Sequence, residues 1–172
     1  MSKSPYRGKM IDFKIIKALK LIESKLRGSG VRWILAGSVS LALQGVNVKP
    51  NDIDILTDEK GAFEINRILK DYEVKPVRFR RSKAFQSYFG EFEIEGVKVE
   101  VMGDLREFVE GEWRSLSHRL STPKIIEIEG IRLPVSQLED QLRSYQALGR
   151  RKDSSKVRRI REALARRNPD GA

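Results

Sequence analysis

The strongest constraint on the fold is a mostly apolar run that ends in glycine and continues as a short helix-like stretch. Residues 31–36 form the run, and Gly37-Ser38 follow it directly. This pattern predicts a strand, a tight turn and a helix over residues 38–43. Glycine permits close approach, the serine hydroxyl adds a donor, and free N–H groups at a helix start attract anions. The segment therefore predicts a phosphate-binding turn.

Two aspartates follow on the next predicted strand, residues 52–56, after a gap of thirteen residues. Asp52 and Asp54 share one face because strand side chains repeat every second residue. Adjacent carboxylates repel each other unless a cation holds them, and Mg²⁺ suits one or two carboxylates plus substrate phosphate. The alternative is that the two acids merely cap or flank a loop. Against it, two acids on one face of an otherwise apolar strand would be costly without a compensating charge. A phosphate cradle with a metal-holding pair indicates phosphoryl or nucleotidyl transfer.

A third carboxylate is expected from a β-hairpin over residues 85–94 and 97–102. Valines alternate with other residues along its second strand, so Glu100 points away from the valine face. If this strand lies beside the aspartate strand, three carboxylates converge. Glu100 could then bind metal or accept the proton of an attacking hydroxyl. The alternatives are an ordinary exposed glutamate, or Asp104 in its place.

At these residues the sequence resembles a known family. Gly37-Ser38 followed by Asp52-x-Asp54 is similar to the signature of nucleotidyltransferases related to DNA polymerase β, particularly small stand-alone, toxin–antitoxin-associated and antibiotic-adenylylating members. The resemblance is best over residues 31–102. It implies that Asp52, Asp54 and Glu100 are catalytic and bind Mg²⁺ or Mn²⁺, and that Gly37 and Ser38 hold the β- and γ-phosphates. Relatives usually carry aspartate at the position of Glu100.

The end of the chain extends the resemblance. Gly149-Arg150-x-Lys152-Asp153 is similar to the turn that closes a helix in small nucleotidyltransferases, which implies nucleotide binding by Arg150 and Lys152. Many relatives carry a lysine one turn earlier, where this chain has Tyr145, a residue that could stack on a base or simply pack. Lys49, close to the aspartates in sequence, could meet the triphosphate or the carboxylates, or be a plain surface lysine.

The fold class expected is α/β (α+β), a nucleotidyltransferase-like mixed sheet flanked by helices. We expect residues 1–135 to form the catalytic domain and residues 136–172 a C-terminal helical segment packed on it. Further helices are predicted over 10–27, 58–72, 136–148 and 154–167, with Phe63 on the buried side of the second and a capping box from Ser136 to Glu139 opening the third. A second hairpin is predicted over 124–128 and 131–135.

Composition narrows the possible partners. The net charge is +10, and residues 143–172 hold ten Lys or Arg against three Asp or Glu. Such a block could bind nucleic acid through its phosphates or be a solvated helix surface. The cationic run 75–83 could grip a triphosphate or RNA, or keep an edge strand soluble. The chain lacks cysteine and any apolar stretch of membrane-spanning length, so we expect no disulfide, no membrane contact and a cytoplasmic protein.

The expected activity is Mg²⁺-dependent transfer of an NMP, with AMP from ATP as the leading case, to an acceptor hydroxyl with release of pyrophosphate. The acceptor stays open among RNA, a protein hydroxyl and a small molecule. Two other hypotheses remain: a non-catalytic nucleotide- or RNA-binding module with the same fold, and an antitoxin-type modifier of a partner protein.

Overall fold

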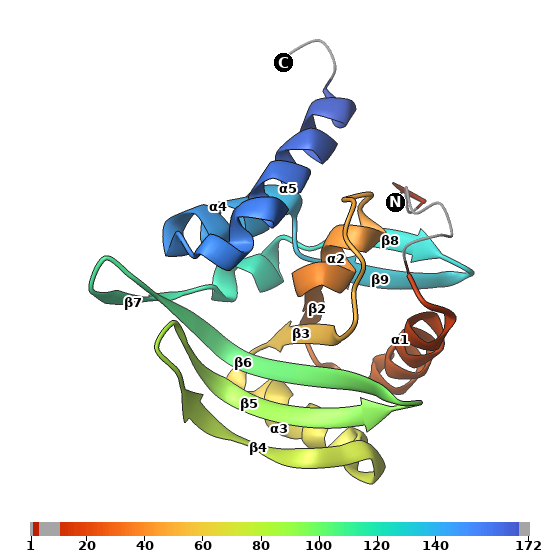
Figure 1. Ribbon diagram of the computed structural model, residues 1–172. Coiled ribbons are helices and arrows are strands. Elements are labelled where there is room, and N and C mark those ends of the chain that lie inside the picture. Colours follow the sequence, from red (N-terminus) through yellow and green to blue (C-terminus); the bar gives the residue numbers. More distant parts are fainter. Residues whose placement is uncertain (1, 4–10, 169–172) are drawn as a thin grey trace.

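The computed structural model describes residues 2–3 and 11–168 of the chain, and it shows a twisted mixed sheet with helices on both sides (Figure 1). The helices are α1 (Phe13–Leu26), α2 (Gly37–Leu43), α3 (Glu59–Ile68), α4 (Leu138–Leu148) and α5 (Ser154–Arg167), with 3-10 turns η1 (Lys70–Tyr72), η2 (Ser117–Ser121) and η3 (Arg151–Asp153). The strands are β1 (Ser2–Lys3), β2 (Trp33–Ala36), β3 (Ile53–Thr57), β4 (Glu73–Arg81), β5 (Phe85–Ile94), β6 (Val97–Val109), β7 (Glu112–Ser115), β8 (Lys124–Ile128) and β9 (Ile131–Val135).

The sheet brings together strands that are far apart in sequence. Its order is β1-β8-β9-β2-β3-β6-β5-β4, and β7 extends it by pairing with the end of β6. β3 runs antiparallel to β2 and parallel to β6, so the aspartate strand lies between the turn strand and the Glu100 strand. The expected mixed sheet with flanking helices is confirmed.

The two faces of the β3–β6 region are covered differently. α1 and α3 contact the inner face of β6, where Val97, Val99 and Val101 are buried in the main core. A smaller apolar cluster lies on the opposite face and includes Leu56 and Leu105. Glu100 alternates with the buried valines, so its side chain faces away from α1 and α3. This second face carries the site described below.

Several expected helix ends differ in the structure. Met10 lies outside the described residues, and α1 begins at Phe13 after Asp12, whose carboxylate accepts a hydrogen bond from the Lys14 N–H at 2.9 Å. The helix expected to reach residue 72 gives way to η1 after Ile68, and Phe63 is 46% exposed, tilted against Tyr88 instead of buried.

The predicted capping box at Ser136 is wrong. Gln137 is the N-cap residue of α4, and no side chain caps this helix end. The Ser136 N–H continues the pairing of β9 with β2 by donating to the Leu35 carbonyl at 2.9 Å, and its side chain is fully buried. Sheet pairing therefore keeps Ser136 in the strand and out of the cap position.

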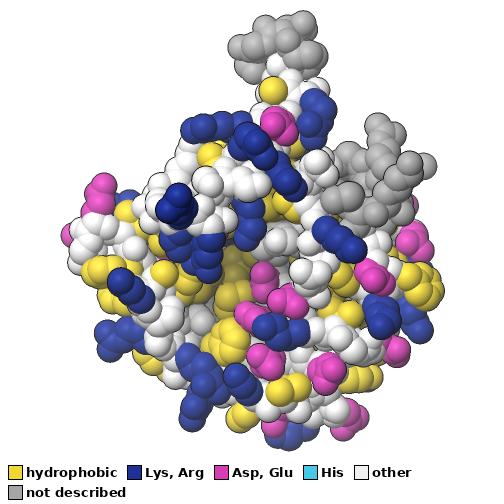
Figure 2. Space-filling view, in the orientation of Figure 1, with side chains coloured by type: hydrophobic (Ala, Val, Ile, Leu, Met, Phe, Trp, Pro, Cys, Tyr) yellow, Lys and Arg dark blue, Asp and Glu magenta, His cyan; other side chains and the backbone are white. Residues whose placement is uncertain are grey.

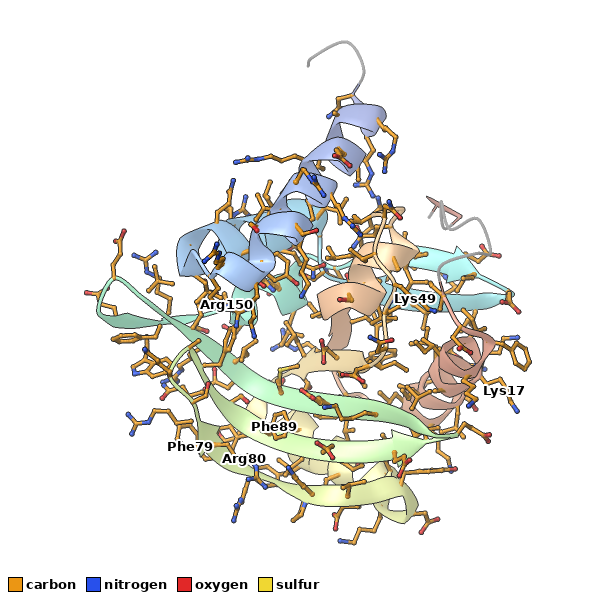
Figure 3. All side chains as sticks on the ribbon, in the orientation of Figure 1. Lys17, Lys49, Phe79, Arg80, Phe89 and Arg150 are labelled. Atoms are coloured by element: carbon orange, nitrogen blue, oxygen red, sulfur yellow. The ribbon has the colours of Figure 1, made fainter. Side chains whose placement is uncertain are left out.

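The cationic run forms most of β4, which lies at the edge of the sheet as the soluble-edge alternative expects. Arg80 lies over the ring of Phe89 on the neighbouring strand, 5.9 Å from its centroid (Figure 3). None of the described helices combines the length and apolar character needed to cross a membrane.

Three arginines of α5 bind backbone carbonyls just beyond α2. Arg159 donates to Asn47, Arg166 donates to Gly45 at 3.0 Å, and Arg167 donates to Gln44 at 3.5 Å. Cations are favourable at the carbonyl end of a helix. Part of the basic C-terminal block is therefore structural, while Arg151, Arg158 and Arg161 line an open groove of about 720 Å³ between α4 and α5.

A substitution at Gly103 tests the packing of α3 on β6. A Cβ atom there would lie 2.7 Å from both the Ala62 Cβ and the Asp58 carbonyl oxygen. We expect Gly103→Ala to lower the free energy of unfolding by about 1–3 kcal/mol, whereas Ser155→Ala on exposed α5 should change it by less than about 0.5 kcal/mol. Urea denaturation measures both; an unchanged Gly103→Ala midpoint would contradict this packing.

Candidate active site

The site is built on the pairing of β3 with β6. Parallel register places Asp54 beside Glu100, and antiparallel register with β2 places Asp54 opposite Ala36, the last residue before the glycine turn. Burial, followed by the charges of Glu100 and Asp52, raises the pKa of Asp54 from 3.8 to about 7. The three predicted carboxylates therefore lie within electrostatic reach of one another.

Gly37 joins the turn to the carboxylates. Its φ is +63°, and a Cβ atom there would fall 2.0 Å from Asp54 Oδ2. Any other residue would collide with that carboxylate and strain the backbone. Glycine is needed because the Asp54 side chain occupies the space beside the turn.

Gln141 of α4 holds this turn. In the amide orientation that matches donors with acceptors, Gln141 accepts from the Gly37 N–H at 3.2 Å and donates to Ser40 Oγ at 2.8 Å. The Gly37 amide is thus engaged by protein, which leaves the first-turn N–H and hydroxyl of Ser38 as the donors for an anion.

A cavity of about 350 Å³ lies over the carboxylates. Seven predicted site residues line it: Gly37, Ser38, Asp54, Glu100, Tyr145, Arg150 and Lys152. Lys49 and Asp52 are absent from its lining. Lys49 is exposed and lies on the other side of α2 from Arg150 (Figure 3), because the loop before β3 carries it away from the cavity.

Lys98 links Asp52 to the cavity. Its Nζ lies 3.0 Å from Glu100 Oε1 and 3.8 Å from Asp52 Oδ2. The Glu100 and Asp52 carboxylates raise the pKa of Lys98. Alternation along β6 already put Lys98 on the face of Glu100, so this cation could have been found from the sequence. The Lys98 ammonium group therefore lies near both the Asp52 and the Glu100 carboxylates.

The opposite wall is cationic and comes from the C-terminal helices. Arg150 Nε donates to the buried Asp153 Oδ2 at 2.7 Å, and its guanidinium lies 5.2 Å from the ring centroid of Phe85. Lys156 was not predicted from the sequence. Its Nζ lies 5.3 Å from the ring centroid of Tyr145, and its positive charge partly offsets the rise in the pKa of Asp54. Figure 2 shows a central hollow with an apolar floor, Lys and Arg along the side of the C-terminal helices, and Asp and Glu across from them.

Tyr145 packs within this wall. Burial, then the negative charges of Asp153 and Asp54, raises the pKa of its hydroxyl to about 12. The tyrosine is therefore a neutral group at physiological pH. Its ring also contributes to the main core.

The carboxylates fit a hard divalent cation. Within the described ranges, no group of three or more His, Cys, Asp or Glu side chains is placed to hold a metal ion, so the expected convergence of Asp52, Asp54 and Glu100 on one cation is not seen. Mg²⁺ does not need such a group, since it binds through one or two carboxylates and takes water and substrate phosphate as further ligands. Carboxylate oxygens are ligands that suit Mg²⁺ or Mn²⁺.

The chain is similar to known nucleotidyltransferases. Residues 18–160 match the family model described as aminoglycoside-2''-adenylyltransferase. A Thermotoga maritima protein assigned as a nucleotidyltransferase shares 39% sequence identity and a TM-score of 0.78, covering 88% of this chain and 94% of that chain. No curated protein sequence matches.

Two more distant structures share the fold alone. They are the lincosamide antibiotic adenylyltransferase LnuA bound to lincomycin (14% identity, TM-score 0.55, 87% of this chain and 96% of that chain) and ANT(2'')-Ia with adenylyl-2''-tobramycin (12%, 0.56, 88% and 88%). Together with the family match and the 39% identical relative, they confirm the resemblance to polymerase β-like enzymes. The chain belongs to the aminoglycoside-2''-adenylyltransferase family of nucleotidyltransferases.

Proposed function

We propose that the protein transfers an NMP, with AMP from ATP as the leading case, from an NTP to an acceptor hydroxyl and releases pyrophosphate. The observation that carries the proposal is the placement of Asp54 against Gly37 and beside Glu100, in one cavity with Arg150, Lys152 and Lys156. Acidic and basic walls that face each other suit a metal-bound triphosphate.

The basic wall and Ser38 bind the triphosphate. Ser38 offers its hydroxyl and a first-turn N–H group, while Lys152, Lys156 and Arg150 supply positive charge from the other side. α2 spans only seven residues, so its dipole contributes little and the cations supply most of the attraction. Gly37 acts by making room for Asp54.

Asp54 and Glu100, which line the cavity, would hold Mg²⁺ or Mn²⁺, with Asp52 just before β3 as a further carboxylate. When bound, the divalent ion neutralises phosphate charge and polarises the phosphoryl group. Burial and the neighbouring Glu100 and Asp52 carboxylates raise the pKa of Asp54 to about 7, so the group is only partly ionised at neutral pH, and a bound divalent ion would favour its carboxylate form.

The transfer forms one bond and breaks one. The acceptor oxygen attacks the α-phosphorus, and the bond from that phosphorus to the bridging oxygen of the β-phosphate breaks. Glu100 accepts the proton of the acceptor hydroxyl. Lys152 and Lys156 neutralise the charge on the departing pyrophosphate.

The acceptor is RNA, a protein or a small molecule. The structure of LnuA holds lincomycin, and that of ANT(2'')-Ia holds adenylyl-2''-tobramycin. This chain carries a net charge of +10 and exposed arginines on α5, which favour an anionic acceptor such as RNA over a cationic one.

The direct test is incubation with each labelled NTP, Mg²⁺ or Mn²⁺ and a cell extract, followed by separation of RNA, protein and small molecules. The proposal expects one fraction to become labelled only when the divalent ion is present. Lack of label in every fraction, with all four nucleotides, would favour the non-catalytic alternative.

Asp54→Asn should abolish this labelling, by about a hundredfold or more, without unfolding the protein. The raised folded pKa means that Asp54 supports folding while protonated: its contribution is present below the unfolded value of 3.8 and is lost as the pH rises through about 7. With chelator present, Asp54→Asn should therefore raise Tm relative to wild type more at pH 8 than at pH 5. A variant that melts far below wild type at both pH values would indicate a structural role instead.

Lys98→Gln should increase affinity for Mg²⁺ because Lys98 is an internal cation that competes for Asp52 and Glu100. Half-exposed ion pairs are weak, so we expect about a two- to fivefold decrease in the Mg²⁺ concentration that half-saturates thermal stabilisation. Lys17→Gln, which removes an ion pair with Glu95 on the surface, is the matched control. Weaker Mg²⁺ binding by Lys98→Gln would contradict this account.

A further inference from the structure

We propose that the part of the cavity lined by Glu107 and Arg119 recognises the base of the bound NTP, and that both side chains contact the polar edge of the base. The inference rests on the proposed function and adds a base subsite to it. Glu107 comes from β6 and Arg119 from η2, and both residues line the same cavity as Ser38 and Asp54.

Both side chains are buried yet incompletely paired. Glu107 and Arg119 are each 5% exposed, and neither Glu107 Oε2 nor Arg119 Nε has a hydrogen-bond partner. Unpaired buried polar atoms are costly, and buried charges more so. The fold tolerates this cost at a cavity wall, where a ligand can supply the missing partners.

Arg119 is fixed in place by hydrogen bonds from its Nη2 atom. Its Nη2 donates to the Asp140 carbonyl at 3.0 Å and to Ser144 Oγ, which ties η2 to α4. These bonds hold the guanidinium plane and leave Nε–H free. The structural role of Arg119 therefore accounts for its Nη2 atom and leaves its Nε–H without a partner.

Glu107 and Arg119 are neighbours without being an ion pair. Burial lowers the pKa of Arg119, and the negative charge of Glu107 opposes that shift, so the two groups sense each other. No ion pair within 4.0 Å joins them in the described part of the chain. A ligand edge could bridge them, accepting from Arg119 and donating to Glu107.

The walls around these groups suit a flat ring. Phe85 lies directly across from Glu107 in the β5–β6 pairing, and Met102, Leu105 and Leu116 add apolar surface. A nucleobase has apolar faces and an edge on which an N–H donor adjoins a nitrogen or oxygen acceptor. A single NTP could then place its phosphates near Ser38 and its base beside Glu107 and Arg119.

Binding measurements test the proposal without requiring turnover. Full-length protein with Mg²⁺ is titrated with non-hydrolysable analogues of the four NTPs and with inorganic tripolyphosphate, which has no base. Glu107→Gln keeps the shape of the side chain but replaces one carboxylate oxygen by an amide NH₂ group. We expect it to weaken the preferred NTP by roughly ten- to a hundredfold and to leave tripolyphosphate affinity unchanged.

Glu112→Gln, on exposed β7, is the matched control and should change neither affinity. Equal weakening of tripolyphosphate and NTP by Glu107→Gln, or unchanged affinity for all four NTPs, would overturn the base subsite. The base subsite would also be overturned if Glu107→Gln left NTP binding unchanged but raised the acceptor concentration that transfer requires. Wild-type protein that binds neither NTP nor tripolyphosphate would instead defeat the proposed function itself.

A test on wild-type protein covers the case in which Glu107→Gln fails to fold. Removing the exocyclic amine from the preferred base, as in purine riboside triphosphate when ATP is preferred, should weaken binding by a similar factor. Where the variant folds, the two losses should not add, because both remove the same contact. Equal wild-type affinity for the parent nucleotide and its amine-free analogue would contradict the proposal.

Discussion

The site depends on the parallel pairing of β3 with β6. That register sets Asp54 beside Glu100, and the antiparallel pairing of β3 with β2 sets Asp54 against Gly37. Carboxylates so close together oppose their own ionisation, as the raised pKa of Asp54 shows. The fold holds them together because the opposite face of the same strands is locked into the core by buried Ile53, Ile55 and Val99.

The C-terminal helices complete the site. α4 contributes Gln141, which holds the glycine turn, and the start of α5 contributes Lys156. Buried Asp153 orients Arg150, and the arginines of α5 bind the carbonyls that follow α2. The helix that supplies positive charge to the cavity is thus fastened to the segment that follows α2, the helix that begins at the glycine turn.

Much of the carboxylate site could be predicted because its signals are local. Alternation fixes which side of their strands Asp54 and Glu100 occupy, and glycine after an apolar run marks the turn. Asp52 lies just before β3 and outside the cavity lining, because the strand begins one residue later than predicted. Gln141, Lys156, Glu107 and Arg119 were missed because they reach the cavity from elements whose relative placement leaves no periodic signal. Lys49 lies outside the cavity, since nearness in sequence does not fix the direction of a loop.

The central claim is that Asp54 and Glu100 hold a divalent ion beside the turn at Ser38. A crystal structure with Mn²⁺ and a non-hydrolysable ATP analogue, with anomalous data at the manganese edge, tests it most directly. The account predicts a manganese peak bound by both carboxylates and a phosphate within hydrogen-bond distance of Ser38. A peak away from these carboxylates, or a triphosphate bound outside the cavity, would contradict it.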